Sequence, residues 1–391
     1  MSDELSVYRH RRDPRFDFLS ESDRHAFARP VPSRRLAVIG TGTMGQEHMH
    51  VIAVAGRAAL HGIFDSATRS IDTALREYAK TGLGPPRVYR SLDEAARDGT
   101  IDAFIVCTPN YTHLEVLQTL IKARKPVLVE KPMATTVADA HAMVRLADAH
   151  GVPVQVGLQY RFKAQYREAI ALALERRVVG EVKMLTLSEH RPPFLDKVGQ
   201  WNKFADLSGG TLVEKCCHYF DLLNLFAGAK PVSAYAIGGQ AVNFKNFRYD
   251  NRRADIDDHA VVAIRYENGV NASFTLNMFS PSFSEELVVF GDAGRLCAFE
   301  HDDVFANTRS TGLDVDLRPH GARTRSEPRY PAYIEDSGHH GASFHAHLQF
   351  CASLELQAGD AASMQDGLWS VAVADAAQRS LASGEPEAVE L

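Results

Sequence analysis

The sequence predicts an α/β domain with a doubly wound parallel sheet, followed by an α+β domain with an open, mostly antiparallel sheet. Between residues 36 and 157, short apolar runs alternate with helix-compatible stretches, which is typical of parallel strands covered by helices. Beyond about residue 160, strands follow one another with few helices between them, which favours antiparallel pairing. A length of 391 residues also suits two domains.

Three segments are expected: an N-terminal extension over residues 1–33, a first domain over 34–158 and a second over 159–391. The extension is polar and contains no apolar run that could form a signal-peptide core. It carries four aromatic residues, Tyr8, Phe16, Phe18 and Phe27. It is therefore either an arm packed on the body or on a neighbouring subunit, or a partly ordered tail.

The apolar runs place the expected strands and helices along the chain. The strands of the first domain are expected at residues 36–39, 60–64, near 88, 101–107, 126–129 and 154–157, with helices at 43–55, 66–80, 112–123 and 137–149. The second domain is expected to have helices at 163–178 and 210–226, strands at 233–239, 259–266, 270–279, 285–290 and 295–299, and closing helices at 344–357 and 364–382. Residues 301–340 are polar, and a long loop is expected there.

Composition and charge exclude several classes of partner. A net charge of −6 leaves no basic excess for binding nucleic acid, and no apolar run reaches the ~18 residues that a membrane span needs. The five cysteines include no CxxC spacing, so neither a disulfide framework nor a metal site is expected. These features favour a reducing, cytoplasmic location.

A glycine-rich turn follows the first strand. Gly40, Gly42 and Gly45 match the GxGxxG pattern, with Thr41, Thr43 and Met44 between them. The first glycine permits a tight turn, the second lets the backbone approach a pyrophosphate, and the third lets the helix pack on the strand. Because the motif lies between a strand and a helix, it predicts a dinucleotide site.

The end of the second strand carries a carboxylate, Asp65, which lies 20 residues after Gly45. A carboxylate at this position can hold a ribose diol and repels a 2′-phosphate, which favours NAD. Ser66 and Arg69 could weaken the preference for NAD over NADP, so NADP is the alternative cofactor. Asp65 could also cap the following helix.

Polar residues follow the next strands at the same edge of the sheet. Thr108, Pro109, Asn110 and His113 come after the strand at 101–107. They form either a cofactor contact or an ordinary turn, in which Asn110 caps a helix and His113 lies on the surface.

The strand at 126–129 leads into Glu130, Lys131 and Pro132. Proline fixes its own φ, and ligands of such sheets bind at the carboxyl ends of the strands. Lys131 is therefore expected to be a positive charge held at a fixed place in the site.

The second domain offers a candidate acid/base pair. Glu214 and His218 are four residues apart on the helix expected at 210–226, so they should share a face, where the carboxylate could orient the imidazole. An ordinary helix pair is the alternative. Lys215 should point elsewhere, and the adjacent Cys216 and Cys217 are expected to be packing residues.

These four motifs, in this order, resemble the glucose-fructose oxidoreductase, inositol dehydrogenase and rhizopine-catabolism (Gfo/Idh/MocA) family. The resemblance covers about residue 35 to the last residue, and Asp366 with Gly367 in the closing helix also fits. It implies a Rossmann domain, an open antiparallel sheet, and hydride transfer between a sugar, glycoside or inositol-like hydroxyl and NAD. Lys131 would contact the reacting oxygen as an ammonium and His218 would be the acid/base. The family's usual residue at position 214 is Asp, whereas this chain has Glu.

The resemblance completes the expected site. The expected cofactor-binding residues are Gly40, Thr41, Gly42, Thr43, Met44, Gly45, Asp65, Arg69, Thr108, Pro109, Asn110, His113, Glu130 and Lys131. The expected substrate-binding residues are Lys131, Arg161, Trp201, His218 and His340; Lys197 and Asn202 lie on segments that could line the same pocket. For Arg161, Trp201, Lys197 and Asn202, packing or surface charge is the alternative.

Two other activities stay open. His339, His340 and Gly341 resemble a segment found near the active site of some family members, including one that uses NAD to cleave glycosides by oxidation and elimination. The other alternative is a non-catalytic regulator that binds the dinucleotide. An exposed face of the second sheet would need a cover, so a homo-oligomer, a dimer or tetramer, is expected.

Overall fold

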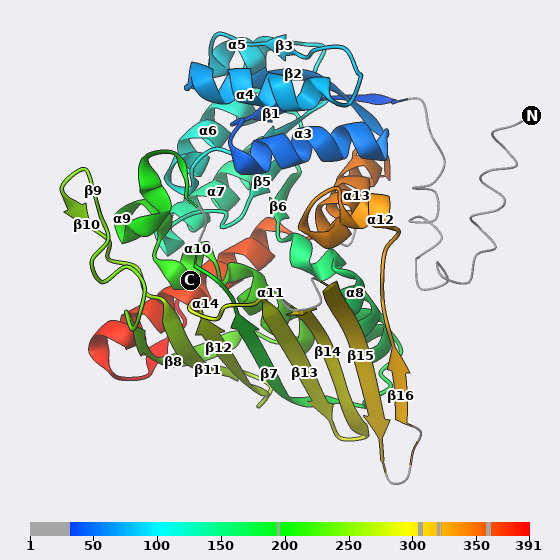
Figure 1. The fold of residues 1–391 in the computed structure, drawn as a ribbon, viewed down its shortest axis with the longest axis vertical. Coiled ribbons are helices and arrows are strands. Elements are labelled where there is room, and N and C mark those ends of the chain that lie inside the picture. The colour runs from blue at the N-terminus through cyan, green and yellow to red at the C-terminus, as the bar shows by residue number, and fades with distance from the viewer. Residues whose placement is uncertain (1–31, 194–195, 304–307, 319–320, 322, 357–360) are drawn as a thin grey trace, which may run out of the picture.

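The computed structural model describes residues 32–391 except 194–195, 304–307, 319–320, 322 and 357–360. The four aromatic residues of the N-terminal extension lie outside the described residues. Figure 1 shows two lobes: a smaller lobe of strands wrapped by helices, and a larger lobe built on a broad sheet that carries helices on one face.

The first lobe holds a six-stranded parallel sheet with the strand order β3-β2-β1-β4-β5-β6. Its strands are β1 Arg34–Ile39, β2 Ala58–Phe64, β3 Arg87–Val88, β4 Ala103–Val106, β5 Val127–Glu130 and β6 Val154–Gly157. Its helices are α3 Thr43–Ala55, α4 Thr68–Ala79, α5 Leu92–Arg97, α6 His113–Leu120 and α7 Val137–His150. The chain reverses direction across the sheet between β1 and β4, and ligands of such sheets bind beside that point.

The second lobe holds a nine-stranded sheet with the order β16-β15-β14-β13-β7-β12-β11-β8-β17. Its strands are β7 Val182–His190, β8 Pro231–Gly239, β11 His259–Tyr266, β12 Asn271–Asn277, β13 Ser284–Gly291, β14 Gly294–Asp303, β15 Thr308–Leu317, β16 Arg323–Ser326 and β17 Glu387–Ala388. Of the strand pairs that the structure describes here, β7 with β12 is parallel and the others are antiparallel. The expected fold class is thereby confirmed.

Helices cover one face of this sheet and leave the other open (Figure 1). The covering helices are α8 Ala164–Ile170, α11 Cys217–Ala227 and α14 Met364–Ser383, which pack on β14, β7 and β8 respectively. On the open face, Met184, Tyr235, Ile237 and Val261 are exposed. This apolar face is compatible with a homo-oligomer, which stays a prediction.

Further elements of the described chain lie outside the two large sheets. They are the ribbon of β9 Arg248–Tyr249 and β10 Arg252–Arg253, and the helices α9 Ala205–Ser208, α10 Thr211–Glu214, α12 Ala332–Glu335 and α13 Ala342–Leu356. Helix α13 packs against α3 of the first lobe and against the turn Gln159–Phe162, where the chain passes between the lobes. Among the described helices, none combines the length and apolarity that crossing a bilayer requires.

The structure corrects the expected loop at residues 301–340. Much of this segment forms β15, β16 and α12, and β14 extends into it. In β15, Leu313 and Val315 are buried, while Asp314 pairs with Arg325 of β16 and Asp316 with Arg295 of β14. These charges, which suggested a loop, are therefore cross-strand pairs that join β14, β15 and β16 near the sheet edge.

Two further expectations about the second lobe were incomplete. The strand β7 was not expected, although it lies near the centre of the sheet; its inward residues include the fully buried Glu189, which weakens the apolar alternation. The helix expected at 210–226 is interrupted at Lys215 and Cys216, between α10 and α11. The ammonium of Lys215 is held there by Glu189 and by the Tyr160 hydroxyl.

Candidate active site

The glycine turn between β1 and α3 is shaped to admit a phosphate group. Gly40 has φ +93°, and a Cβ there would lie 2.6 Å from the Cys107 carbonyl carbon. A Cβ on Gly45 would lie 2.0 Å from the Gly40 oxygen, whereas a Cβ on Gly42 would meet no atom within 4 Å. Gly42 therefore borders open space at the N-terminus of α3, which no side chain caps. This geometry fits the pyrophosphate of a dinucleotide.

The carboxylate of Asp65 is fixed beside this turn. Its Oδ2 accepts hydrogen bonds from Thr41 N at 2.7 Å and Thr41 Oγ1 at 3.1 Å, and its Oδ1 accepts one from Ala67 N at 2.8 Å. Ala67 is the N-cap of α4, so Asp65 is not the helix cap that the sequence offered as an alternative. Arg69 lies exposed in the first turn of the same helix.

His113 joins two strand ends of the sheet. It is fully buried, with Nδ1 at 3.0 Å from the Pro132 oxygen and Nε2 at 3.0 Å from the Thr108 oxygen. The surface alternative for His113 was therefore wrong. Asn110 begins a short 3-10 turn, and its buried Nδ2 has no hydrogen-bond partner among the residues that the structure describes. Thr108, Pro109 and Asn110 thus stand at the carboxyl edge of the sheet beside Pro132, as the cofactor prediction requires.

Lys131 reaches across from the end of β5 to the second lobe. Its Nζ donates to the Glu214 backbone oxygen at 2.8 Å and lies 3.7 Å from Glu214 Oε1, and the Lys131–Pro132 peptide bond is cis. Burial lowers the pKa of Lys131, but the Glu214 carboxylate raises it above its ordinary value. Burial raises the pKa of Glu214, and the Lys131 charge brings it below its ordinary value. The structure thus places an ammonium and a carboxylate together at this site.

His218 lies buried in the first turn of α11. Its ring stacks on Tyr160 with the centroids 3.9 Å apart, and within the described part of the chain its buried Nδ1 has no hydrogen-bond partner. Burial lowers the pKa of His218 well below its ordinary value, and the charges of Lys131 and Lys215 lower it further. The expected Glu214–His218 pair is not formed, because the helix break lies between them and Glu214 contacts Lys131 instead. Glu214 therefore orients Lys131.

A buried series of hydrogen bonds runs from Glu130, the neighbour of Lys131, to helix α13. Glu130 Oε1 lies 2.9 Å from His48 Nε2, and His48 Nδ1 lies 2.5 Å from His347 Nε2 of α13. Burial raises the pKa of Glu130, but the His48 hydrogen bond brings it below its ordinary value. Glu130 is buried and bonded to His48, and its expected contact with the cofactor stays a prediction. No local sequence pattern predicts these hydrogen bonds, because His347 is distant from His48 in the sequence.

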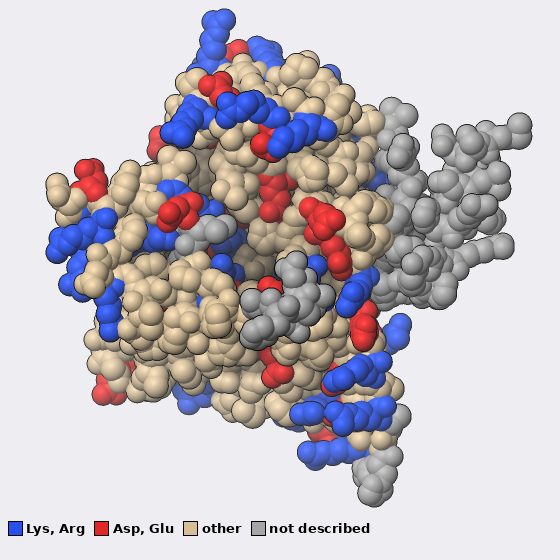
Figure 2. Space-filling view, viewed as in Figure 1, with Lys and Arg blue, Asp and Glu red and all other residues tan. Residues whose placement is uncertain are grey.

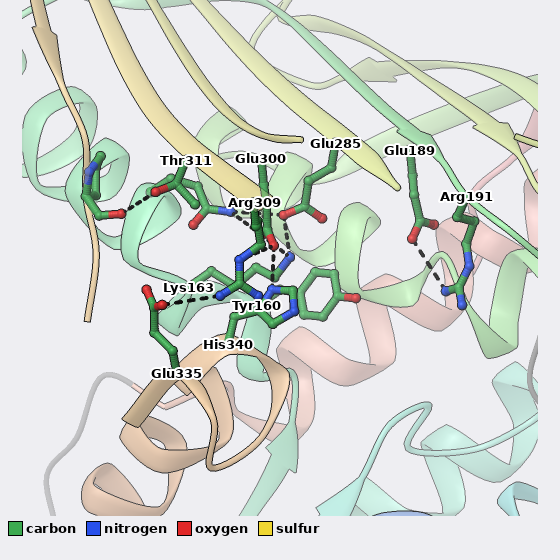
Figure 3. A network of polar contacts seen from close by, with 12 residues as sticks. Tyr160, Lys163, Glu189, Arg191, Glu285, Glu300, Arg309, Thr311, Glu335 and His340 are labelled. Carbon is green, nitrogen blue, oxygen red and sulfur yellow. Dashed lines mark hydrogen bonds and ion pairs between the residues drawn. The ribbon is translucent and has the colours of Figure 1, made fainter. Parts of the chain in front are cut away.

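Tyr160 links His218 to a charged network on the covered face of the large sheet (Figure 3). Lys163 Nζ lies 4.6 Å from the centre of the Tyr160 ring and is bonded to Glu285 at 2.5 Å and Glu300 at 2.9 Å. The sequence prediction selected Arg161 from this segment, but its neighbour Tyr160 touches His218. The polar and aromatic run directly after β6 was the signal that could have found it.

The expected substrate residue His340 belongs to the same network. It forms an ion pair with Glu300, while its neighbour His339 pairs with Glu47 of α3 at 2.7 Å. Burial raises the pKa of Glu47, but His339 and Ser343 lower it to about 2. Both histidines have positive φ values, 42° and 55°. The segment therefore connects the two lobes beside Tyr160, whose ring centre lies 6.4 Å from that of His339.

Two further expected substrate residues are Arg161, which pairs with acidic side chains, and Trp201, which is partly exposed. The Arg161 guanidinium makes two hydrogen bonds to Asp221, at 2.7 and 2.5 Å, and an ion pair with Asp366 at 3.2 Å. These contacts are compatible with the packing alternative of the sequence analysis, and a substrate contact of Arg161 stays a prediction. Trp201 is partly exposed in the 3-10 turn Val198–Lys203, and its substrate contact stays a prediction.

The surface is hollowed between the two lobes, and Lys and Arg side chains gather on one wall of the hollow (Figure 2). Within the described residues, no cluster of three or more His, Cys, Asp or Glu side chains is arranged to hold a metal ion.

A glycine turn that borders open space, a carboxylate fixed beside it and a lysine at the carboxyl edge of a parallel sheet are together typical of a nicotinamide-dependent oxidoreductase. Two family models match the chain: the NAD-binding Rossmann fold of an oxidoreductase family over residues 34–158, and the C-terminal alpha/beta domain of that family over 172–391. The chain belongs to the Gfo/Idh/MocA oxidoreductase family. The expected family, enzyme class and NAD cofactor are confirmed.

Relatives and solved structures agree with this assignment. A myo-inositol 2-dehydrogenase of Thermotoga maritima is 27% identical over 267 residues, covering 68% of this chain and 75% of its own. An inositol 2-dehydrogenase of Rhizobium meliloti is 24% identical over 361 residues, 89% of this chain and 97% of its own. The WlbA dehydrogenase of Bordetella pertussis, solved with NADH and UDP-GlcNAcA, has a TM-score of 0.70 at 25% identity, covering 91% and 99% of the two chains.

Proposed function

We propose that this protein oxidises a hydroxyl group of a sugar or cyclitol with NAD, and that Lys131 and His218 act on that hydroxyl. The observation that carries the proposal is the placement of two buried side chains. Lys131 Nζ is held 2.8 Å from the Glu214 backbone oxygen, and the His218 ring is stacked on Tyr160. The surroundings favour the ammonium form of Lys131 and the neutral form of His218. A hydroxyl between them meets a hydrogen-bond donor that stabilises negative oxygen and a base that accepts its proton.

Each group has a separate role in the proposed reaction. Bound NAD supplies the hydride acceptor at the carboxyl edge of the first sheet. The substrate hydroxyl gives its proton to the His218 imidazole as its carbon gives up a hydride, and the Lys131 ammonium stabilises the oxygen while negative charge develops. Glu214 fixes the Lys131 ammonium, and Tyr160 fixes the plane of the His218 ring through stacking.

The substrate class is supported by the relatives. The Thermotoga and Rhizobium proteins are named for inositol, and the Bordetella structure holds a sugar nucleotide. We extend to this chain only what these names share, a polyhydroxylated ring. For the cofactor, Asp65 at the end of β2 supports NAD, with NADP as the alternative.

The test is a screen of inositols, pyranoses and their acids for NADH formation by the wild-type protein and by Lys131→Met. Oxidation of at least one polyol by the wild type, with strongly reduced turnover in the variant, supports the proposal. Equal turnover in the two proteins contradicts the role of Lys131. Titration with NADH and NADPH, followed by fluorescence, tests the cofactor, because tighter NADPH binding contradicts the role of Asp65.

A second candidate is glycoside cleavage through oxidation and elimination. It is favoured by the position of His339, close to the Tyr160 ring on which His218 stacks, since cleavage needs a further acid/base group near the ring. Release of a phenol from a nitrophenyl glycoside, with no net NADH, would select it. Dinucleotide binding with neither activity would select the non-catalytic regulator.

A further inference from the structure

A continuous series of buried contacts joins helix α13 to the main chain at Lys131. His347 Nε2 lies 2.5 Å from His48 Nδ1, and His48 Nε2 lies 2.9 Å from Glu130 Oε1. The other carboxylate oxygen, Glu130 Oε2, accepts a hydrogen bond from the backbone N–H of Lys131, with the two atoms 3.2 Å apart. His48, His347 and Glu130 are each 4% exposed or less, so water cannot readily take the place of any partner in the series.

The charges of these groups set the direction of the hydrogen bonds. The pKa of Glu130 lies below its ordinary value, so the carboxylate is ionised and only accepts. Burial lowers the pKa of His48, but Cys107 and Glu130 raise it well above its ordinary value. Burial and the charge of His48 lower the pKa of His347 well below its ordinary value. His48 therefore donates from both ring nitrogens, to the Glu130 carboxylate and to the neutral His347 ring.

The neighbouring strand leaves room for the carboxylate in this position. Gly157 of β6 is the pairing partner of Glu130 in β5. A Cβ on Gly157 would lie 2.9 Å from Glu130 Oε1 and 3.2 Å from Glu130 Cα. A larger residue would push Glu130 away from the place where it meets both His48 and the Lys131 N–H. Residues of α13, α3 and β6 thus act together on the position of one carboxylate.

We propose that His347 and His48 are positioning residues for Lys131: they hold the Glu130 carboxylate, and Glu130 holds the main chain from which Lys131 reaches the reacting oxygen. The proposal rests on the proposed function, in which the Lys131 ammonium stabilises that oxygen. It gives α13, near the C-terminal end of the chain, a part in the chemistry of the first lobe. A displacement of about 1 Å can cost about 10²-fold in rate, so this support should act on turnover more than on binding.

The test compares two substitutions of His347 that differ in one property. Glutamine keeps an acceptor for the hydrogen on His48 Nδ1, whereas leucine fills the space without one. His347→Leu should lower kcat for polyol oxidation about tenfold or more. The KM for the polyol and the Kd for NADH should both stay within about twofold of the wild type. His347→Gln should keep most of the wild-type kcat, a rescue that a role in packing alone would not produce.

Ser343→Ala is the matched control. Ser343 also joins α13 to α3, but its hydroxyl donates to Glu47, at 2.5 Å, and not to Glu130. The control should leave kcat unchanged even where it lowers the melting temperature. A loss of kcat in Ser343→Ala equal to that in His347→Leu overturns the proposal, because any weakening of the contact between the two helices would then have the same effect.

Glu130→Gln is the second variant, and it keeps the test decisive if His347→Leu does not fold. Glutamine has the shape of glutamate, but one of its two polar atoms is a donor. It cannot accept from both His48 and the Lys131 N–H, so kcat should again fall about tenfold or more. If kcat in every variant that folds stays within about twofold of the wild type, the proposal is wrong.

Crystal structures of the wild type, His347→Leu and Glu130→Gln measure the placement directly and do not depend on turnover. In the two variants, Lys131 Nζ should move by about 1 Å or more from its position 2.8 Å from the Glu214 backbone oxygen. An unmoved Lys131 overturns the proposal. A displaced Lys131 in a protein whose wild type oxidises no polyol leaves the positioning role standing and contradicts the dehydrogenase. Polyol oxidation at the wild-type kcat by both variants leaves the dehydrogenase standing and contradicts the positioning role.

Discussion

Replacement of Lys131 by Met should lower kcat about 10²–10³-fold, because loss of a preorganised donor to a developing oxyanion costs about 2.7–4 kcal/mol. The structure favours the upper part of this range. Only 14% of the Lys131 side chain is exposed, so water can replace the lost ammonium poorly. NADH affinity should change by less than about threefold, about 0.7 kcal/mol, since the ammonium contacts Glu214 rather than the glycine turn. Steady-state NADH formation and NADH fluorescence titration measure the two quantities.

The same variant leaves the Glu214 carboxylate without its main partner. Breaking a buried ion pair from one side costs about 3–5 kcal/mol of folding free energy, so stability must be measured beside activity. The double variant Lys131→Met with Glu214→Gln removes the unpaired charge, and it should recover stability but not turnover. A Lys131→Met protein whose kcat stays within about threefold of the wild type, about 0.7 kcal/mol in the barrier, would refute the reasoning.

Three further predictions follow from other parts of the site. The acid limb of kcat/KM should rise as His218 loses its proton, with a midpoint below the ordinary histidine pKa of 6.5, since its pKa is lowered; a midpoint above that value in a pH–rate profile contradicts the neutral-base assignment. Gly42→Ala should keep the melting temperature and weaken NADH binding, whereas Gly45→Ala should lower the melting temperature, because its Cβ would lie 2.0 Å from a backbone oxygen; equal effects on both quantities would contradict this division. Lys163→Met should lower the free energy of unfolding in urea by about 3–5 kcal/mol, because two buried carboxylates lose their cation; a change below about 1 kcal/mol, typical of exposed ion pairs, would show that the network is not stabilised by this charge.

The first lobe was largely predictable because its signals are local. Buried parallel strands are nearly continuous apolar runs, and the steric needs of Gly40 and Gly45 act within a few residues. The strands β7 and β15 were not predicted, because their signals are not local. Their polar residues include Glu189 and Asp314, whose ionic partners lie on other elements of the fold. The alternation of apolar residues along a single strand does not indicate those partners.

The candidate site was predictable as a set of residues but not as a set of contacts. The motifs selected Lys131, Glu214 and His218, yet the spacing argument assumed an unbroken helix and paired Glu214 with the wrong neighbour. The support of His48 by His347 crosses 299 positions of sequence, so only the folded chain reveals it. The expected oligomer and the individual ligand contacts stay predictions.

The contacts of α13 bear on how the protein unfolds. This helix packs on α3, its His347 is bonded to His48, and the segment before it brings His339 to Glu47. All three contacts join a segment near the C-terminal end of the chain to the first lobe. A fragment ending near residue 158 would leave His48, Glu47 and one side of α3 without these partners. The nucleotide-binding half is therefore expected to depend on the other half for its own stability, and the whole chain is expected to unfold as one cooperative unit.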